Sequence, residues 1–388
     1  MQIFDRFDDS RGWSEGERIL LDQVTRLADE VIAPNAERFD REASFPWENV
    51  ESIRELGLNA IFVPDAYGGA PMSYRVYLEC MKLISEACAA TGIVYGTNFH
   101  AMGPVLDFGP EELKARIMPR VAEGAICSLA ITEPNAGSDA TGMTTRFSPD
   151  GDEIVIDGGK IFITSGDVAD LILLFGKWSG IEDDRGAITA LVLEKGAPGF
   201  TVERTEDKMG IRASSTAVLS FDDCRVPRAN LVGAPGEGLS ILLLSLNKSR
   251  PSIASHALGI ADAAFKDMVA FMNDRRQSGQ RIVDFQGNQF MLADLAAELA
   301  MTKAWIDYVG RLVDGGAKDY GVEASIAKLR ASDLAMKMTT EAVQMHGGYG
   351  FCKDFRVERL MRDAKITQIW EGTNQIHRQF IGRSFARR

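Results

Sequence analysis

One acidic residue near the C-terminus has a setting in which a carboxylate could move a proton. Glu371 stands between Trp370 and Gly372. A carboxylate is a weak base in water, but burial in a dry pocket raises its pKa and makes it a better proton acceptor at neutral pH. The local sequence alone favours a plainer interpretation, in which Glu371 is a solvated carboxylate near the start of the last helix and Thr373 or Asn374 caps that helix.

Other familiar catalytic and cofactor patterns are missing from the sequence. The glycine run at 347–350 follows a helical stretch, so it does not open a helix after a strand as a dinucleotide-binding fingerprint does. The sequence contains neither a P-loop nor a G-x-S-x-G elbow. The histidines are far apart and the cysteines form no C-x-x-C pair, so we expect no metal site and reduced thiols.

The elements that must position Glu371 change type twice along the chain. Ser14 and Glu17 have the spacing of a capping box before a helical first third, with further helices expected over 46–57, 72–88 and 110–123. Short runs at 153–157, 160–164, 171–175, 187–193 and 216–221 then predict strands, and the Gly and Pro between them favour antiparallel connections. Helical periodicity returns from about residue 238, kinked or restarted near Pro251.

Bulk properties narrow the class of protein. The chain has 388 residues, which exceeds the size of one hydrophobic core, so two or three packed units are expected. The net charge of -12 argues against nucleic acid and anionic lipid as partners. We expect a cytoplasmic protein, because the sequence shows no targeting segment at its start and no apolar stretch of about 18 residues that would span a membrane.

Two segments resemble the signatures of the acyl-CoA dehydrogenase family. They are Leu-Ala-Ile-Thr-Glu-Pro-Asn-Ala-Gly-Ser-Asp at 129–139 and Arg-Asp-Ala-Lys-Ile-Thr-Gln-Ile-Trp-Glu-Gly-Thr-Asn-Gln-Ile at 362–376. Further segments of the family fall between them in the family's order: 208–212, 249–251, 286–293 and 344–350. The resemblance covers nearly the whole chain.

The resemblance implies a mainly helical α+β fold with three domains. We expect an N-terminal helical domain over 1–124, a middle antiparallel β-domain over 125–235 and a C-terminal four-helix bundle over 236–388. It also implies non-covalent FAD and α,β-dehydrogenation of an acyl-CoA thioester. In that reaction Glu371 matches the base that takes the α-proton, the flavin takes the β-hydride, and electrons pass to an electron-transferring flavoprotein.

The resemblance assigns the remaining site residues in two groups. In the 129–138 segment, small and hydroxyl residues let the backbone approach the flavin; the alternative there is a tight Asn-Ala-Gly turn that Ser138 caps. Phe162 stands where many relatives have Trp, and its alternative is plain strand core. The implied FAD-binding residues are Leu129, Ile131, Thr132, Gly137, Ser138, Phe162, Thr164, Arg275, Gln277, Phe285, Gln286, Gln344, Gly347, Gly348, Thr373, Asn374 and Gln375.

The second group would bind the substrate: Ser138, Asn247, Arg250, Trp370 and Gly372, with Tyr95, Gly96 and Phe99 as further pocket walls. Arg250 resembles a CoA-contacting arginine, and a surface salt bridge is its alternative. The positions that match contacts to the FAD of a neighbouring subunit are Arg275, Gln277, Phe285, Gln286 and 344–348. We therefore expect a homo-oligomer, usually a tetramer in this family.

The sequence departs from the family pattern at Ser278, where relatives commonly carry an aromatic residue. A serine cannot stack, so the adenosine half of FAD could be held differently. Competing functions are an acyl-CoA oxidase on the same fold, a non-catalytic or nucleic-acid-associated flavoprotein, and a lyase. The retained Glu371 and the net charge of -12 argue against the last two.

Overall fold

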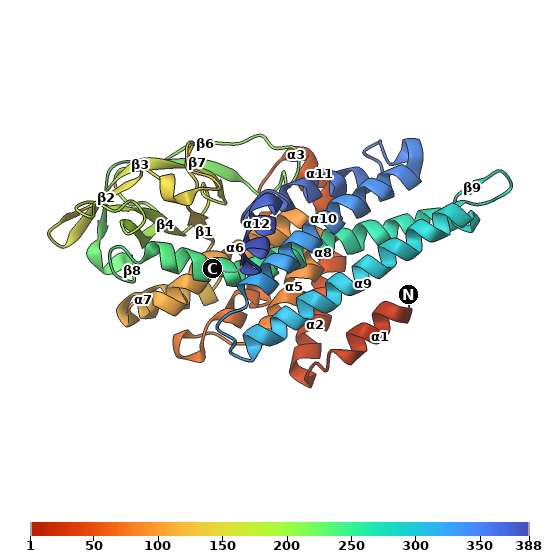
Figure 1. Cartoon of the computed structure of the whole chain (residues 1–388), viewed down its shortest axis with the longest axis horizontal. Coiled ribbons are helices and arrows are strands. Elements are labelled where there is room, and N and C mark those ends of the chain that lie inside the picture. Colours follow the sequence, from red (N-terminus) through yellow and green to blue (C-terminus); the bar gives the residue numbers. More distant parts are fainter. Residues whose placement is uncertain (1, 387–388) are drawn as a thin grey trace.

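The computed structural model describes residues 2–386 and shows a mixed sheet at one end of a long body of helices (Figure 1). The N-terminal third is helical, as predicted, and the capping box of Ser14 and Glu17 at the start of its second helix is confirmed. Its helices are α1 Gln2–Ser10, α2 Glu15–Leu27, α3 Ala33–Glu42, α4 Trp47–Glu55, α5 Tyr74–Ala87, α6 Ala89–Phe108 and α7 Glu111–Ala122.

The middle third forms a sheet of eight strands in the order β6-β7-β3-β2-β4-β5-β8, with β1 paired to β4. The strands are β1 Cys127–Ala130, β2 Arg146–Asp150, β3 Glu153–Thr164, β4 Leu171–Trp178, β5 Ile188–Glu194, β6 Phe200–Thr205, β7 Thr216–Pro227 and β8 Leu231–Val232. Most neighbouring strands are antiparallel, as predicted, but the sheet is mixed, because β4 runs parallel to both β1 and β2. After α7 the chain enters β1, which pairs with β4 although β2 and β3 lie between these two strands in the sequence.

The C-terminal third returns to helices, and two of them are the longest in the described chain. They are α8 Gly238–Asp274, α9 Gln286–Asp314, α10 Gly321–His346, α11 Val357–Thr367 and α12 Asn374–Ser384. A short hairpin of β9 Arg276–Gln277 and β10 Gln280–Arg281 joins α8 to α9. The helix does not restart at Pro251, because α8 continues through this residue.

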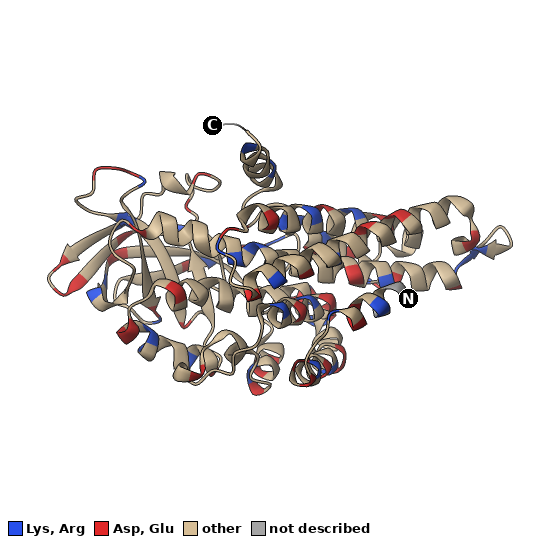
Figure 2. Ribbon diagram, turned by 60° about the horizontal axis from the view of Figure 1, so that its bottom comes forward, with Lys and Arg blue, Asp and Glu red and all other residues tan. Residues whose placement is uncertain are grey.

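Charged side chains cover the surface without separating by sign. Figure 2 shows acidic and basic residues side by side along the helices in view. None of the helices in residues 2–386 is long and apolar enough to cross a membrane.

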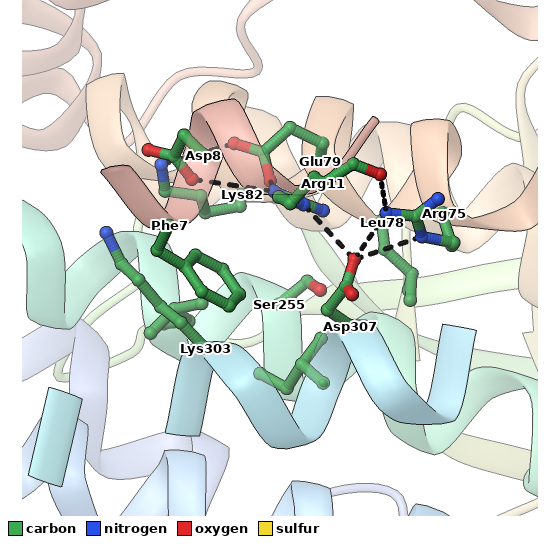
Figure 3. A pocket seen from close by; sticks show the side chains of 12 residues that line it. Phe7, Asp8, Arg11, Arg75, Leu78, Glu79, Lys82, Ser255, Lys303 and Asp307 are labelled. Carbon is green, nitrogen blue, oxygen red and sulfur yellow. Dashed lines mark hydrogen bonds and ion pairs between the residues drawn. The ribbon is translucent and has the colours of Figure 1, made fainter. Parts of the chain in front are cut away.

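A buried ion cluster fixes the N-terminal helix to the rest of the molecule (Figure 3). Arg11, directly after α1, pairs with Glu79 of α5 and, at 3.2 Å, with Asp307 of α9. Arg75 of α5 reaches the same oxygen of Asp307 at 2.8 Å. Burial alone would raise the pKa of Glu79, but the charges of Lys82 and Arg11 lower it to about 2. The pairing therefore keeps Glu79 ionised although it is buried.

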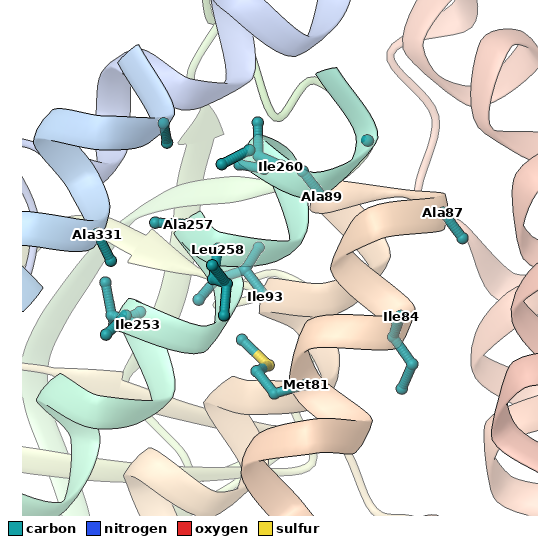
Figure 4. Packing of buried hydrophobic residues seen from close by; sticks show 14 of the residues in the cluster. Met81, Ile84, Ala87, Ala89, Ile93, Ile253, Ala257, Leu258, Ile260 and Ala331 are labelled. Carbon is teal, nitrogen blue, oxygen red and sulfur yellow. The ribbon is translucent and has the colours of Figure 1, made fainter. Parts of the chain in front are cut away.

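The largest apolar core lies where α5, α6, α8 and α10 meet (Figure 4). Met81 of α5, Ile93 of α6 and Ile253 of α8 pack there with little or no exposure. Close approach of the helices requires a small residue at Gly259 of α8, where a Cβ would lie 2.4 Å from the carbonyl oxygen of Lys82 on α5. This packing holds α8 and α10 rigidly behind the turn that carries Glu371.

Candidate functional site

Glu371 lies in the turn between α11 and α12, with a backbone that few residues adopt. Its φ is 53°, and Gly372 follows with φ 88°. Thr373 caps α12, because its hydroxyl accepts a hydrogen bond from the backbone N–H of Ile376. The cap therefore agrees with the plainer interpretation of this segment, but the carboxylate does not point into solvent. Its Oε2 accepts a hydrogen bond of 2.7 Å from the hydroxyl of Ser249, on α8.

The surroundings of Glu371 favour its protonated form. Burial raises the pKa of its carboxyl, and the hydrogen bond from Ser249 and the positive charges of Arg250 and Lys328 offset only part of this effect. A raised pKa means that the carboxylate, once formed, binds a proton more tightly than a solvated carboxylate does. The group therefore has the electrostatics of a general base.

Two hydrogen bonds hold the turn itself. The Nε2 atom of His377 lies 3.1 Å from the carbonyl oxygen of Glu371, and the ammonium of Lys328 donates to the carbonyl oxygen of Gly372 at 2.7 Å. Within residues 2–386, no group accepts a hydrogen bond from the backbone N–H of Glu371. The turn thus leaves one donor next to the carboxylate available for a ligand.

Aromatic side chains of α5 and α6 form a wall close to Glu371. The rings of Tyr77 and Phe99 lie 4.5 Å apart, and those of Tyr77 and Tyr95 lie 5.7 Å apart. The hydroxyl of Tyr77 lies 2.9 Å from that of Ser252 on α8, one turn after Ser249, which binds Glu371. Tyr95 and Phe99, expected as pocket walls, therefore belong to the aromatic cluster around Tyr77. At Gly96 a Cβ would lie 2.7 Å from Cε of Met81, so the helices are tightly packed there.

A second group of predicted residues meets at β1 and β3 in the sheet. The backbone N–H of Ile161 donates to the carbonyl oxygen of Thr132 at 2.9 Å, which joins the segment after β1 to β3. Phe162 then leaves the regular strand: its φ is 59°, the pairing of β3 with β7 is irregular there, and its ring is 60% exposed. An aromatic ring that faces outward cannot be strand core, so that alternative for Phe162 is wrong. Leu129, Ile131 and Thr164 are half-buried on the same two segments, and Gly137 and Ser138 are exposed in the following loop.

A buried ion pair supports this segment from behind, and no pattern in the sequence indicates it. Lys160 is completely buried in β3 and pairs with Glu133 at 2.7 Å. The same ammonium donates to the carbonyl oxygen of Ile131 at 2.9 Å, and Glu133 accepts hydrogen bonds from the backbone N–H groups of Thr144 and Thr145. Burial would raise the pKa of Glu133, but Lys160 lowers it to about 2. The ion pair thus fixes the backbone on both sides of Thr132.

The residues around these two segments fit the FAD that the resemblance implies. Within residues 2–386, the hydroxyl groups of Ser165 and Ser214 and the indole N–H of Trp370 are buried and have no hydrogen-bond partner. Buried polar groups without a partner are rare in proteins and are commonly satisfied by a ligand or water. The exposed ring of Phe162 and the unpaired hydroxyl of Ser165, three residues further along the chain, suit a planar, polar ring system such as a flavin.

The predicted FAD residues between Arg275 and Gly348 lie far from this sheet. Arg275 and Gln277 lie at the hairpin between α8 and α9, Phe285 and Gln286 follow it, and Gln344, Gly347 and Gly348 lie at the end of α10. The guanidinium of Arg275 lies 5.5 Å from the ring centre of Tyr349, so these segments meet one another. Figure 1 shows the hairpin at the opposite end of the molecule from the sheet. One copy of the chain therefore does not bring the two groups together.

Ser278 forms part of the tight turn of this hairpin. Its φ is 50° and that of Gly279 is 83°, and Gln277 pairs with Gln280 across them. Two successive positive φ values are typical of the two-residue turn that fits the twist of a hairpin. Ser278 is exposed and small. It therefore does not fill the volume that an aromatic side chain would occupy at this turn.

Two predicted contacts are already engaged within the protein. Arg250 is buried, donates to Asn247 at 3.2 Å and Ser325 at 3.3 Å, and lies 5.6 Å from the ring centre of Phe380. Within residues 2–386 its buried Nε has no partner and its guanidinium pairs with no carboxylate, so a surface salt bridge is not its role. Asn374 is also buried, and its side-chain oxygen accepts hydrogen bonds from Lys328 and Ser332. Gln375 is exposed on α12.

Comparison with family models gives three matches that follow one another along the chain. The N-terminal domain of acyl-CoA dehydrogenase matches residues 14–125, its middle domain matches residues 128–224, and its C-terminal domain matches residues 236–386. An acyl-CoA dehydrogenase of Bacillus subtilis strain 168 is 39% identical over 95% of this chain and 97% of its own length.

Solved structures give the same result in three dimensions. Butyryl-CoA dehydrogenase from Megasphaera elsdenii superimposes with a TM-score of 0.94 at 34% identity, over 97% of this chain and 99% of its own. A chain in a structure of the electron transferring flavoprotein of Acidaminococcus fermentans, described for flavin-based electron bifurcation, also gives a TM-score of 0.94, at 37% identity over 97% of this chain and 99% of its own.

Proposed function

Because this chain belongs to the acyl-CoA dehydrogenase family, whose members are FAD-dependent enzymes, we propose that it removes the α- and β-hydrogens of an acyl-CoA thioester with Glu371 as the base. The observation that carries the proposal is the environment of the Glu371 carboxylate. It is held by Ser249 at 2.7 Å, and burial raises its pKa. Such a group accepts the weakly acidic α-proton better than a solvated carboxylate.

The same turn stabilises the charge that proton removal creates. As the α-proton leaves, negative charge develops on the thioester carbonyl oxygen, and a hydrogen-bond donor aimed at that oxygen lowers the barrier. The unpartnered backbone N–H of Glu371 supports this role, since it belongs to the residue that carries the base. FAD, when bound, supplies the acceptor for the β-hydrogen and its electron pair, so that the α,β double bond can form.

The residues that would hold FAD come from two copies of the chain. Leu129, Ile131, Thr132, Gly137, Ser138, Phe162 and Thr164 from the sheet, with Thr373 and Gln375, would hold the ring system and ribityl chain. Arg275, Gln277, Phe285, Gln286, Gln344, Gly347 and Gly348 of a second copy would hold the adenosine half. The distance between these groups in one chain supports a homo-oligomer (Figure 1). The side chain of Asn374, also expected at the cofactor, bonds to Lys328 and Ser332.

The electron acceptor we propose is an electron-transferring flavoprotein. The similarity to a chain from a structure of the electron transferring flavoprotein of Acidaminococcus fermentans supports this partner. An acyl-CoA oxidase on the same fold would pass electrons to oxygen instead. Little peroxide release during turnover with an artificial acceptor would support the dehydrogenase, and stoichiometric peroxide would show the oxidase.

Replacing Glu371 by Gln tests the proposal directly. Glutamine keeps the shape but cannot take a proton, so we expect the variant to retain bound flavin and acyl-CoA binding while turnover falls by roughly 100-fold or more. In the wild-type enzyme, kcat/KM should fall as the pH drops through the raised pKa of Glu371, because only the carboxylate form is active.

The measurement is anaerobic bleaching of the flavin absorbance by a panel of acyl-CoA thioesters of different length and branching. Glu298→Gln serves as the matched control, since it makes the same chemical change at a carboxylate of α9 that pairs with the exposed Lys337 of α10. Normal bleaching rates in Glu371→Gln would show that the base lies elsewhere, and absence of bleaching with every thioester in the wild type would refute the reaction.

A further inference from the structure

A second ionisable side chain is buried beside the proposed base. Lys328 on α10 has no solvent exposure, and its ammonium donates to the carbonyl oxygen of Gly372 at 2.7 Å and to the side-chain oxygen of Asn374 at 3.0 Å. Lysine is almost never fully buried unless its charge is paired. Burial of an ammonium group costs free energy, and the hydrogen bonds of Lys328 to the turn after Glu371 offset that cost. We infer that the turn requires this lysine.

The bond from Lys328 acts on the peptide that directly follows the base. Glu371 and Gly372 both have positive φ, a conformation that is unfavourable for glutamate and persists only when the surroundings determine it. His377 holds the carbonyl oxygen of Glu371 and Lys328 holds that of Gly372, so the two successive peptide planes are fixed. Fixed peptide planes set both the direction of the carboxylate and the direction of the Glu371 N–H.

The support of Lys328 extends into a buried network. The side-chain oxygen of Asn374 accepts from Lys328 and, at 3.1 Å, from the hydroxyl of Ser332, while its amide donates to Asp333 at 2.8 Å. Lys328, Ser332 and Asp333 all lie on α10, so the start of α12 is fastened to one face of that helix. This network occupies both polar atoms of the Asn374 side chain.

Charged side chains from three parts of the fold surround Lys328, and one of them is the proposed base. Glu371 lies in the turn, Arg250 on α8 and Asp333 on α10 itself, and His377 on α12 also feels the charge of Lys328. Burial lowers the pKa of Lys328 to about 7, while Glu371 opposes this change and Arg250 adds to it. In turn, the positive charge of Lys328 lowers the pKa of the Glu371 carboxyl.

We propose that Lys328 is the positioning residue of the base: it holds the Glu371–Gly372 turn through the Gly372 carbonyl and through Asn374 at the start of α12. This inference rests on the proposed function of Glu371. Lys328 does not touch the substrate and acts only through the turn and through its charge.

The test replaces Lys328 by Met, which keeps the length of the side chain but removes both the donor and the charge. A misplaced base slows proton removal, so kcat should fall roughly 10- to 100-fold while KM changes little. Loss of a nearby positive charge raises the pKa of Glu371 further, so the acidic limb of the pH profile of flavin bleaching should move to higher pH. Lys328→Arg keeps a charged donor and should restore the position of that limb.

Lys303→Met is the matched control, since Lys303 is also a buried lysine but pairs with Asp262 at 3.0 Å and belongs to the ion cluster of Figure 3. It should lower the Tm without moving the pH profile. An unchanged pH profile and unchanged kcat in folded Lys328→Met, judged by flavin content and circular dichroism, would overturn the inference.

If Lys328→Met does not fold, Lys328→Gln takes its place, because glutamine keeps a neutral donor and removes only the charge. The acidic limb should then move to higher pH in Lys328→Gln and stay in place in Lys328→Arg. Limbs that shift equally in the two variants would overturn the inference as well. Normal bleaching in Glu371→Gln would instead refute the proposed function itself.

Discussion

At the scale of single residues, the sequence predicts which side chains matter better than it predicts how they are held. The resemblance names Glu371 and Phe162, yet both stand at positive φ, which no local pattern indicates. The partner of the carboxylate, Ser249, is 122 residues away in the sequence. Lys160 escapes prediction because a single lysine within a strand pattern looks like a solvent-facing residue, and only the sheet shows that it meets Glu133.

Phe162 gives a prediction at this scale. Its ring is 60% exposed and its backbone conformation is unfavourable for a bulky residue, so Phe162→Ala should change the free energy of unfolding by no more than about 0.5 kcal/mol. If the ring covers the flavin, the same variant should lose FAD on dilution much faster than the wild type. Denaturant unfolding of the apoprotein and flavin retention on gel filtration measure the two effects.

As a control, Ile163→Ala truncates the buried neighbour and should lower the free energy of unfolding by about 2 to 5 kcal/mol. Unaltered flavin retention in Phe162→Ala would contradict a cofactor role.

At the scale of elements, most helices and strands were predicted, including β4 and β5, whose residues are buried on both faces, and the errors have separate causes. Helix α6 was not predicted, because nearly all of its residues are buried and it has no polar face to give a helical period. The expected pair of strands around residues 158–159 is a single strand, β3, since the two glycines form an irregularity in the pairing with β7 and no reversal of the chain. Pro251 does not end α8, because tight packing against α5 and α10 holds the helix on both sides of it.

Gly158 is the residue on which the course of β3 depends. Its φ is 139°, and a Cβ there would lie 2.8 Å from Cα of Thr145. Gly158→Ala should therefore cost on the order of 2 to 4 kcal/mol, through an unfavourable backbone and a clash that cannot relax easily. Gly16→Ala, in α2 with open space around it, should be neutral or stabilising by up to about 1 kcal/mol. Thermal unfolding of both variants measures these effects, and equal Tm values for Gly158→Ala and the wild type would show that β3 can adopt another path.

At the scale of the whole molecule, the arrangement of domains follows from the order of periodicities, α, then β, then α, but the site does not. The sheet that contains Phe162 and the hairpin that follows Arg275 lie at opposite ends of the folded molecule (Figure 1). Sequence order could not show this separation, because Arg275 and Gln344 lie between the sheet segments and Glu371 along the chain. If both groups hold one FAD, each site is built from two copies.

Mixed oligomers test this arrangement. One copy carries Glu371→Gln with an intact hairpin, and the other carries Arg275→Ala and Gln344→Ala with an intact base and sheet. Each variant alone should be nearly inactive, the first without its base and the second with weakened FAD binding. In a mixed pair, the intact sheet and base of the second copy meet the intact hairpin of the first, so one complete site forms. Co-expression with two different affinity tags, followed by purification through both, yields the mixed species for activity and flavin measurements. A site built within one chain would leave the mixed species as inactive as the two parents, whereas recovered turnover with FAD bound to only part of the sites would show that neighbouring copies complete one another.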